Sequence, residues 1–160
     1  MCYNLEKNMS AWVLILGGST GHGAATAKRL AKDGYGIIAF HFDRGEAKKL
    51  AAETIAEVNK TTDGRCHYFN TNAAAEETMD KYIPQIKEIT GGEPVKLLLH
   101  SIAFGTTTNL FGERPVTQRQ MDMTVHVMGN ALLYWTQKLY AEGLLGNGSR
   151  VMGLTSEGNY

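Results

Sequence analysis

Apolar residues follow two alternating rhythms along the chain. Short apolar runs bounded by glycine or polar residues predict β-strands, and they span Trp12–Leu16, 36–42, 66–70, 95–101 and 150–156. Between these runs, apolar residues recur at helical spacing over 22–33, 47–58, 75–90 and 118–141. The pattern therefore predicts strands and helices that alternate along the whole chain.

The segment 118–141 carries the longest helical pattern. Its apolar residues are spaced 4, 3, 4, 3 and 4 positions apart, and they are Met121, Val125, Met128, Leu132, Trp135 and Leu139. This spacing predicts one uninterrupted helix with a single apolar stripe. In the helix of 75–90, Pro84 predicts a kink or the start of a second helical part, because proline lacks a backbone N–H group.

Alternating strands and helices need crossover connections, and such connections make the strands parallel. We therefore expect an α/β fold, a Rossmann-like doubly wound parallel sheet in the order 3-2-1-4-5 with helices on both faces. The run 95–101 is apolar throughout, as expected for a strand buried on both sides. In such sheets, ligands bind beyond the carboxyl ends of the strands, where the winding direction reverses.

A glycine-rich loop follows the first predicted strand, in the stretch "ILGGSTGHGAATAKRL". Gly17 allows a tight turn out of the strand, Gly21 lets the backbone approach a pyrophosphate, and Gly23 lets the next helix pack close to the sheet. The free N–H groups at the start of that helix favour phosphate. A tight turn needs glycine even without a ligand, but the position between strand and helix favours a cofactor site. The loop adds two hydroxyl groups and one imidazole to this site, from Ser19, Thr20 and His22.

Composition narrows the function classes. The chain has 160 residues, enough for one domain, with 16 basic and 16 acidic side chains, so it lacks the positive charge typical of nucleic-acid binding proteins. Cys2 and Cys66 are far apart and the histidines do not group with other ligands, so we expect no metal site. No signal peptide or membrane span is apparent, and the few cysteines fit a reducing compartment. We expect a cytoplasmic protein without nucleic-acid or membrane partners.

From about Ala11 to Ser156 the sequence resembles the short-chain dehydrogenase/reductase superfamily, whose cofactor loop has the same spacing of three glycines. The segment "LLLHSIAFG" (97–105) occupies the position of that superfamily's Asn-Asn-Ala-Gly segment. Its His-Ser-Ile stretch is similar to the enoyl-acyl-carrier-protein reductases of bacterial fatty-acid synthesis. The glycine loop is closer to the superfamily at large, so the two motifs together indicate a divergent member.

The resemblance implies an NAD(P)H-dependent oxidoreductase, in which the end of the second strand selects the cofactor. His41 stands where members that use NAD carry an acidic residue, and Arg44 follows three positions later. This pair favours NADP(H), while Asp43 keeps NAD(H) open. Asn72 occupies the position of the family's aspartate beside the adenine, and its amide could bind adenine or make a local turn.

The resemblance also implies roles for residues after the later strands. His100, Ser101 and Ile102 would line the cofactor, and Ser156 aligns with the catalytic serine. In ketone-reducing members this hydroxyl binds the reacting carbonyl oxygen, while a tyrosine assisted by a lysine donates the proton. In enoyl reductases a tyrosine stabilises the enolate oxygen instead. His126 takes the position of an active-site asparagine that relays protons, and an ordinary helix histidine is the alternative.

No tyrosine–lysine pair follows Ser156, because Tyr160 lies only four positions later and Glu157 stands where many enoyl reductases have a tyrosine. We therefore expect residues 1–160 to form a single, incomplete domain of a longer reductase, inactive by itself. One hypothesis is a reductase of an enoyl thioester on acyl-carrier protein or coenzyme A, with a 3-oxoacyl thioester or another carbonyl as the alternative substrate. The other is a non-catalytic nucleotide-binding module. Family members pair through the helix at 118–141, which implies a homodimer or homotetramer.

Overall fold

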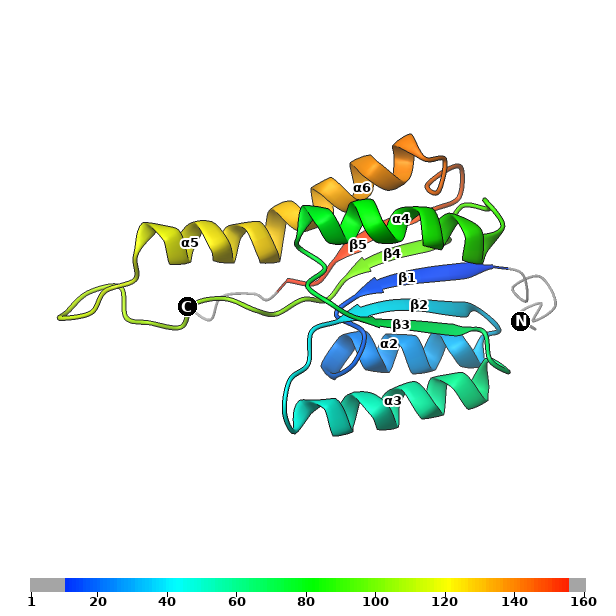
Figure 1. The fold of residues 1–160 in the computed structure, drawn as a ribbon, viewed down its shortest axis with the longest axis horizontal. Helices are drawn as coiled ribbons and strands as arrows, with labels where there is room; N and C mark the ends of the chain where they lie inside the picture. Colours follow the sequence, from blue (N-terminus) through cyan, green and yellow to red (C-terminus); the bar gives the residue numbers. More distant parts are fainter. Residues whose placement is uncertain (1–10, 156–160) are drawn as a thin grey trace.

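A five-stranded parallel sheet forms the centre of the computed structural model, which describes residues 11–155 (Figure 1). Its strands are β1 (Trp12–Leu16), β2 (Gly36–His41), β3 (Cys66–Asn70), β4 (Leu97–His100) and β5 (Arg150–Gly153). The strand order is β3-β2-β1-β4-β5, and every neighbouring pair is parallel. The predicted fold class and strand order are confirmed.

Helices cover both faces of the sheet, as the alternating pattern predicts. On one face lie α2 (Gly21–Lys32) and α3 (Ala47–Thr61), and on the other lie α4 (Glu76–Thr90) and α6 (Ala131–Ala141) (Figure 1). Pro84 lies inside α4, so it does not begin a second helix, and α4 ends at Gly91 in the left-handed conformation (φ +64°). No helix among residues 11–155 is long and apolar enough to cross a membrane.

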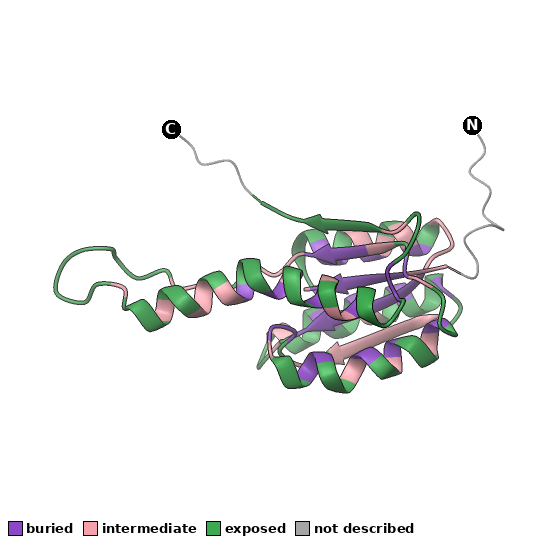
Figure 2. Ribbon diagram, turned by 90° about the horizontal axis from the view of Figure 1, so that it is seen from above, coloured by how far each residue is buried: buried purple, intermediate pink, exposed green. Residues whose placement is uncertain are grey.

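The side chains of β1 alternate between two cores. Leu14 and Leu16 pack toward α4 and α6, whereas Val13 and Ile15 pack toward α2 and α3. All four are fully or almost fully buried, and each contributes roughly 1.5–3 kcal/mol through removal of apolar surface from water. The middle strands of the sheet are thus held from both sides, whereas β5 is exposed along its length (Figure 2).

The expectation of one uninterrupted helix over 118–141 is wrong. Three elements occupy the segment: α5 (Gln118–Val125), a π-helical turn η1 (His126–Asn130), and α6. The wider turn changes which residues face the sheet, because its hydrogen bonds run from residue i to i+5. The buried positions are four residues apart from Val127 onward, namely Val127, Ala131, Trp135 and Leu139.

The predicted apolar stripe is accordingly buried only in its second half. Helix α5 projects beyond the end of the sheet, where no strand lies beneath it (Figures 1 and 2). Met121, Val125 and Met128 are therefore exposed, although they belong to the same sequence pattern as the buried Trp135 and Leu139. The periodicity predicted helical conformation correctly, but it also predicted burial for three residues that are exposed.

Candidate cofactor site

A cleft of about 1050 Å³ lies at the carboxyl ends of the strands. Segments after β1, β2, β3 and β4 line it together with residues of α5, η1 and the segment after β5. Because β2 and β4 flank β1 on opposite sides, the winding direction of the sheet reverses at β1, which is where ligands bind in open α/β sheets. The cleft is large enough for a dinucleotide or a comparable small molecule.

The three glycines of the loop after β1 perform different structural tasks. Gly17 has φ +89°, and a Cβ there would lie 2.6 Å from the carbonyl oxygen of Ser101. A Cβ at Gly23 would lie 1.9 Å from the carbonyl oxygen of Gly17, so only glycine lets α2 start this close to the loop. Gly21 has φ +56° and faces open space at the cleft wall. Gly17 and Gly21 thus expose backbone to the cleft, whereas Gly23 seats the helix.

The start of α2 is suited to an anion. Thr20 is the N-cap residue, yet its side chain makes no capping hydrogen bond, and the first turn of α2 contains no acidic residue. The unpaired N–H groups and the positive end of the helix dipole therefore face the cleft without a competing carboxylate. Ser19, Thr20 and His22 all line the cleft next to Gly21, as expected from the loop sequence.

The segment after β2 brings an imidazole, a carboxylate and a guanidinium to the cleft wall. His41 Nδ1 lies 2.7 Å from Asp43 Oδ2, and the two side chains are only 7% and 15% exposed. Arg44 is exposed, and its guanidinium carbon lies 4.6 Å from the centre of the Phe42 ring. The carbonyl oxygen of Asp43 also accepts a hydrogen bond of 3.2 Å from Asn70 Nδ2. This segment is thus held against β3 while Arg44 faces outward.

Asn72, after β3, lines the cleft and also makes the local turn that the sequence allowed. Its Oδ1 accepts a 3.0 Å hydrogen bond from the backbone N–H of Ala74. That bond uses the side-chain oxygen of Asn72. The amide N–H₂ group can still donate to an acceptor such as an adenine nitrogen. Both interpretations of Asn72 are thus compatible with its position.

His100, which the resemblance places beside the cofactor, lies behind the cleft wall. His100 is 2% exposed, and its Nε2 donates a 3.0 Å hydrogen bond to the carbonyl oxygen of Val127 in η1. It faces the α4 and α6 side of the sheet and is not among the residues that line the cleft. Burial lowers its pKa below the usual value, against the opposing effect of the hydrogen bond. Ser101 and Ile102, the next two residues, do line the cleft as expected.

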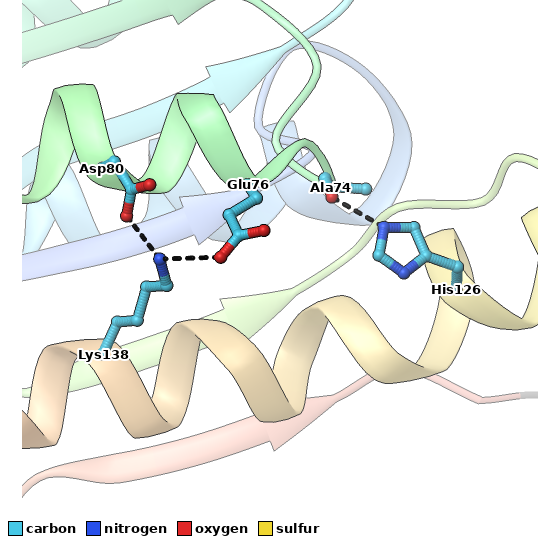
Figure 3. Close-up of polar contacts among 5 residues, drawn as sticks. All are labelled: Ala74, Glu76, Asp80, His126 and Lys138. Atoms are coloured by element: carbon cyan, nitrogen blue, oxygen red, sulfur yellow. Dashed lines mark hydrogen bonds and ion pairs between the residues drawn. The ribbon is translucent and has the colours of Figure 1, made fainter.

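His126 also has a structural partner. Its Nε2 donates a 2.8 Å hydrogen bond to the carbonyl oxygen of Ala74, so the ring joins η1 to the loop after β3 (Figure 3). On α6, Lys138 pairs with Asp80 and lies 3.6 Å from a carboxylate oxygen of Glu76, which joins α6 to α4. His126 does not line the cleft. The geometry therefore favours the ordinary helix histidine over a proton relay.

Residues 11–158 match the sequence model of the short chain dehydrogenases, almost the entire chain. The chain belongs to this family. No curated protein sequence is significantly similar to the chain.

Solved structures of the same fold resemble this short-chain dehydrogenase chain at low sequence identity. A short chain dehydrogenase from Burkholderia cenocepacia J2315 in complex with NADP is 23% identical with a TM-score of 0.74, covering 91% of this chain and 55% of the other. A blue fluorescent protein from a metagenomic library, in complex with NADPH, is 24% identical with a TM-score of 0.73, covering 89% and 54%.

A third similar structure is L-sorbose reductase from Gluconobacter frateurii, complexed with NADPH and L-sorbose. It is 16% identical to this chain with a TM-score of 0.73, and the match covers 91% of this chain and 52% of the reductase. At these identities the likeness shows the fold. The chain spans about half the length of the solved structures that it matches.

Several residues of the cleft in this short-chain dehydrogenase escaped the sequence analysis. They are mainly apolar, and they are Phe42, Thr71, Ala73, Met123, Val127, Met128, Leu154 and Thr155. Phe42 could have been noticed, because an aromatic residue two positions before Arg44 is a suitable surface for a guanidinium. Met128 could not, since it belongs to the apolar stripe that predicts a core position. Ser156, the next residue in the sequence after Thr155, lies outside the described residues. No cluster of potential metal ligands occurs among the described residues.

Proposed function

We propose that this short-chain dehydrogenase chain binds NADP(H) in the cleft and forms the cofactor-binding part of a reductase. The observation that carries the proposal is the arrangement around β1, where Gly17 and Gly21 expose backbone beside the uncapped start of α2. The residues fit the cofactor, because a Cβ-free wall and free N–H groups suit a pyrophosphate. The complexes of similar structures with NADP and NADPH support the same choice.

Each part of the cleft has a distinct task in this proposal. The loop of Gly17 and Gly21 would hold the pyrophosphate, Asn72 would face the adenine, and Arg44 would bind the 2′-phosphate. When bound, the cofactor supplies a hydride for reduction. Ser101 and Ile102 lie beside the glycine loop, because the Ser101 N–H donates a 2.7 Å hydrogen bond to the carbonyl oxygen of Leu16. Met123 of α5 and Met128 of η1 add apolar side chains to the cleft wall. Ser156 is proposed to bind the reacting oxygen of the substrate.

Arg44→Ala tests the cofactor preference. We expect the unmodified chain to bind NADPH more tightly than NADH, and the variant to lose at least tenfold of that preference, because about 1.4 kcal/mol of charge-assisted interaction is removed. Titration of nucleotide fluorescence with the 160-residue chain measures both dissociation constants. Lys48→Ala is the matched control, since Lys48 is an exposed cation outside the cleft. Equal affinity of the unmodified chain for both nucleotides would contradict the preference.

As substrate we propose an enoyl thioester on acyl-carrier protein or coenzyme A. The support is the sequence His100–Ser101–Ile102, which is similar to the enoyl reductases, together with the apolar side chains of Ile102 and Phe104 on the cleft wall. An apolar wall suits the acyl chain of a thioester. The cytoplasmic location stays a prediction that rests on the use of cysteine in the chain.

We also propose that the protein forms a homodimer or homotetramer through α5. The support is the exposed apolar face of α5, formed by Met121 and Val125. Exposed apolar groups that project together from the body of a protein are typical of a contact surface. Helix α5 projects beyond the end of the sheet (Figure 2).

A further inference from the structure

The wall of the cleft after β2 contains two groups with opposite preferences for the cofactor. A free carboxylate accepts hydrogen bonds from the ribose hydroxyls of NAD and repels a 2′-phosphate, whereas a guanidinium attracts that phosphate. Asp43 and Arg44 are adjacent and both line the cleft. If both were equally available, their effects on a 2′-phosphate would oppose each other. The structure shows that they are not equally available.

In the described part of the chain, the carboxylate of Asp43 contacts His41 and makes no ion pair with Arg44. The carboxylate lies 2.7 Å from Nδ1 of His41, a residue that is 8% exposed. Among residues 11–155, no ion pair joins Asp43 to Arg44, and the guanidinium lies on the ring of Phe42 instead. The contact with Phe42 leaves the edge of the guanidinium able to donate hydrogen bonds.

Contacts with β3 and the segment after it hold His41 in place. As the last residue of β2, it is fixed through the hydrogen bond from the Thr71 N–H to the His41 carbonyl oxygen, 2.7 Å long. Its ring lies 6.2 Å from the ring of Tyr68, centre to centre. Burial, with a smaller effect of Cys66, raises the pKa of Tyr68, so the phenol beside His41 is neutral. Asp43 is therefore the charged group in direct contact with the imidazole.

We propose that His41 is a positioning residue that sets the cofactor preference by holding the Asp43 carboxylate away from the ribose. The Nδ1–H group of His41 occupies one carboxylate oxygen and fixes the side chain against the end of β2. Arg44 is then the charged side chain of this segment that is available to an anion in the cleft. An acidic residue is thus retained two positions after the end of the strand without imposing a preference for NAD. This inference rests on the proposed binding of NADP(H).

The test compares dissociation constants for NADPH and NADH in the unmodified 160-residue chain and four variants, measured by fluorescence titration without any substrate. His41→Leu removes the donor, and we expect the ratio of the NADH to the NADPH dissociation constant to fall about tenfold, the effect of one hydrogen bond to a charged group. His41→Asn retains an amide donor near the position of Nδ1 and should keep the ratio within about threefold. His41→Leu combined with Asp43→Asn should restore the ratio, because the released carboxylate is gone.

Asp43→Asn alone provides a measurement that does not depend on the folding of a leucine variant. Because the proposal holds that Asp43 is already withdrawn, this change should alter the ratio by less than about threefold. A tenfold rise in the ratio for Asp43→Asn would overturn the inference, as would an equal fall in His41→Leu and the double variant. Failure of the unmodified chain to bind either nucleotide would instead overturn the proposed function. Thermal unfolding followed by circular dichroism confirms that each variant is folded.

Discussion

Two histidine side chains join the interrupted helix to the sheet, one to the end of β4 and the other to the loop after β3. His100, at the end of β4, donates to the carbonyl oxygen of Val127, and His126 donates to the carbonyl oxygen of Ala74 after β3. Trp135 adds a third ring N–H donor, 2.7 Å from the carbonyl oxygen of Ala73. Because Ala73 and Val127 line the cleft, the hydrogen bonds from Trp135 and His100 hold two residues of the cleft wall in place. The histidines act as structural donors here and do not contact the cofactor space.

The buried His100 makes stability depend on pH. Burial lowers its pKa in the folded chain below the value of about 6.5 in the unfolded chain. The unfolded chain therefore binds more protons between these two values, and stability falls as the pH drops below about 6.5. His100→Gln retains a donor near Nε2 but does not titrate there, so we expect a smaller loss of unfolding free energy between neutral and mildly acidic pH. Denaturant titrations at a series of pH values measure it.

His22→Gln is the matched control, because it removes an exposed imidazole. Part of the pH dependence should remain in the His100 variant, since burial also lowers the pKa of His67 on β3. An equal reduction in both variants would contradict the assignment of the effect to the burial of His100.

At the scale of elements, the sequence predicted the type and order of the helices and strands better than it predicted which side chains face the sheet or the cleft. The alternation of apolar runs located every strand, and Gly17, Gly21 and Gly23 located the turn into α2, because these signals are local. The face of β4 that carries His100 could not be determined, since a strand buried on both sides lacks the polar alternation that reveals which residues share a face. The π-helical turn could not be predicted either. Its backbone is held by contacts between residues far apart in sequence, such as the hydrogen bond from His100 to Val127, and a local pattern does not reveal these.

Helix α5 leads to a prediction about assembly. The double variant Met121→Glu/Val125→Glu places two charges on the apolar face of α5, where Val125 is 53% exposed. If this face is a subunit interface, burying unpaired charges there should weaken association by well over tenfold. Sedimentation velocity over a range of concentrations should show a dimer or tetramer for the unmodified chain and a monomer for the variant.

Leu50→Glu is the control for this experiment, since Leu50 is 57% exposed on α3, on the other side of the sheet. It should leave the assembly unchanged. A monomeric unmodified chain, or an equal effect of Leu50→Glu, would contradict an interface at α5.

At the scale of the whole molecule, the strand order brings distant segments of the chain together at the cleft. The loop after β1, the segment after β2 and the segment after β4 come together at one edge of the sheet, although they are far apart in sequence. This convergence follows from the strand order, which the sequence predicted. Ser156, which is proposed to bind the reacting oxygen, lies outside the described residues. The substrate therefore has to be tested by turnover.

The product of the full open reading frame that encodes this chain should oxidise NADPH in the presence of crotonyl-CoA, and more slowly with acetoacetyl-CoA. The reason is the similarity of His100–Ser101–Ile102 to the enoyl reductases, which add a hydride to the β-carbon of the thioester. Loss of NADPH absorbance measures both rates. Gly17→Ala is the control, since its Cβ would meet the carbonyl oxygen of Ser101 at 2.6 Å and close the cofactor turn. Faster oxidation with acetoacetyl-CoA would instead identify a carbonyl reductase, and no oxidation with either thioester would contradict the proposed substrate class. Undiminished turnover in the Gly17 variant would show that the reaction does not use this cleft.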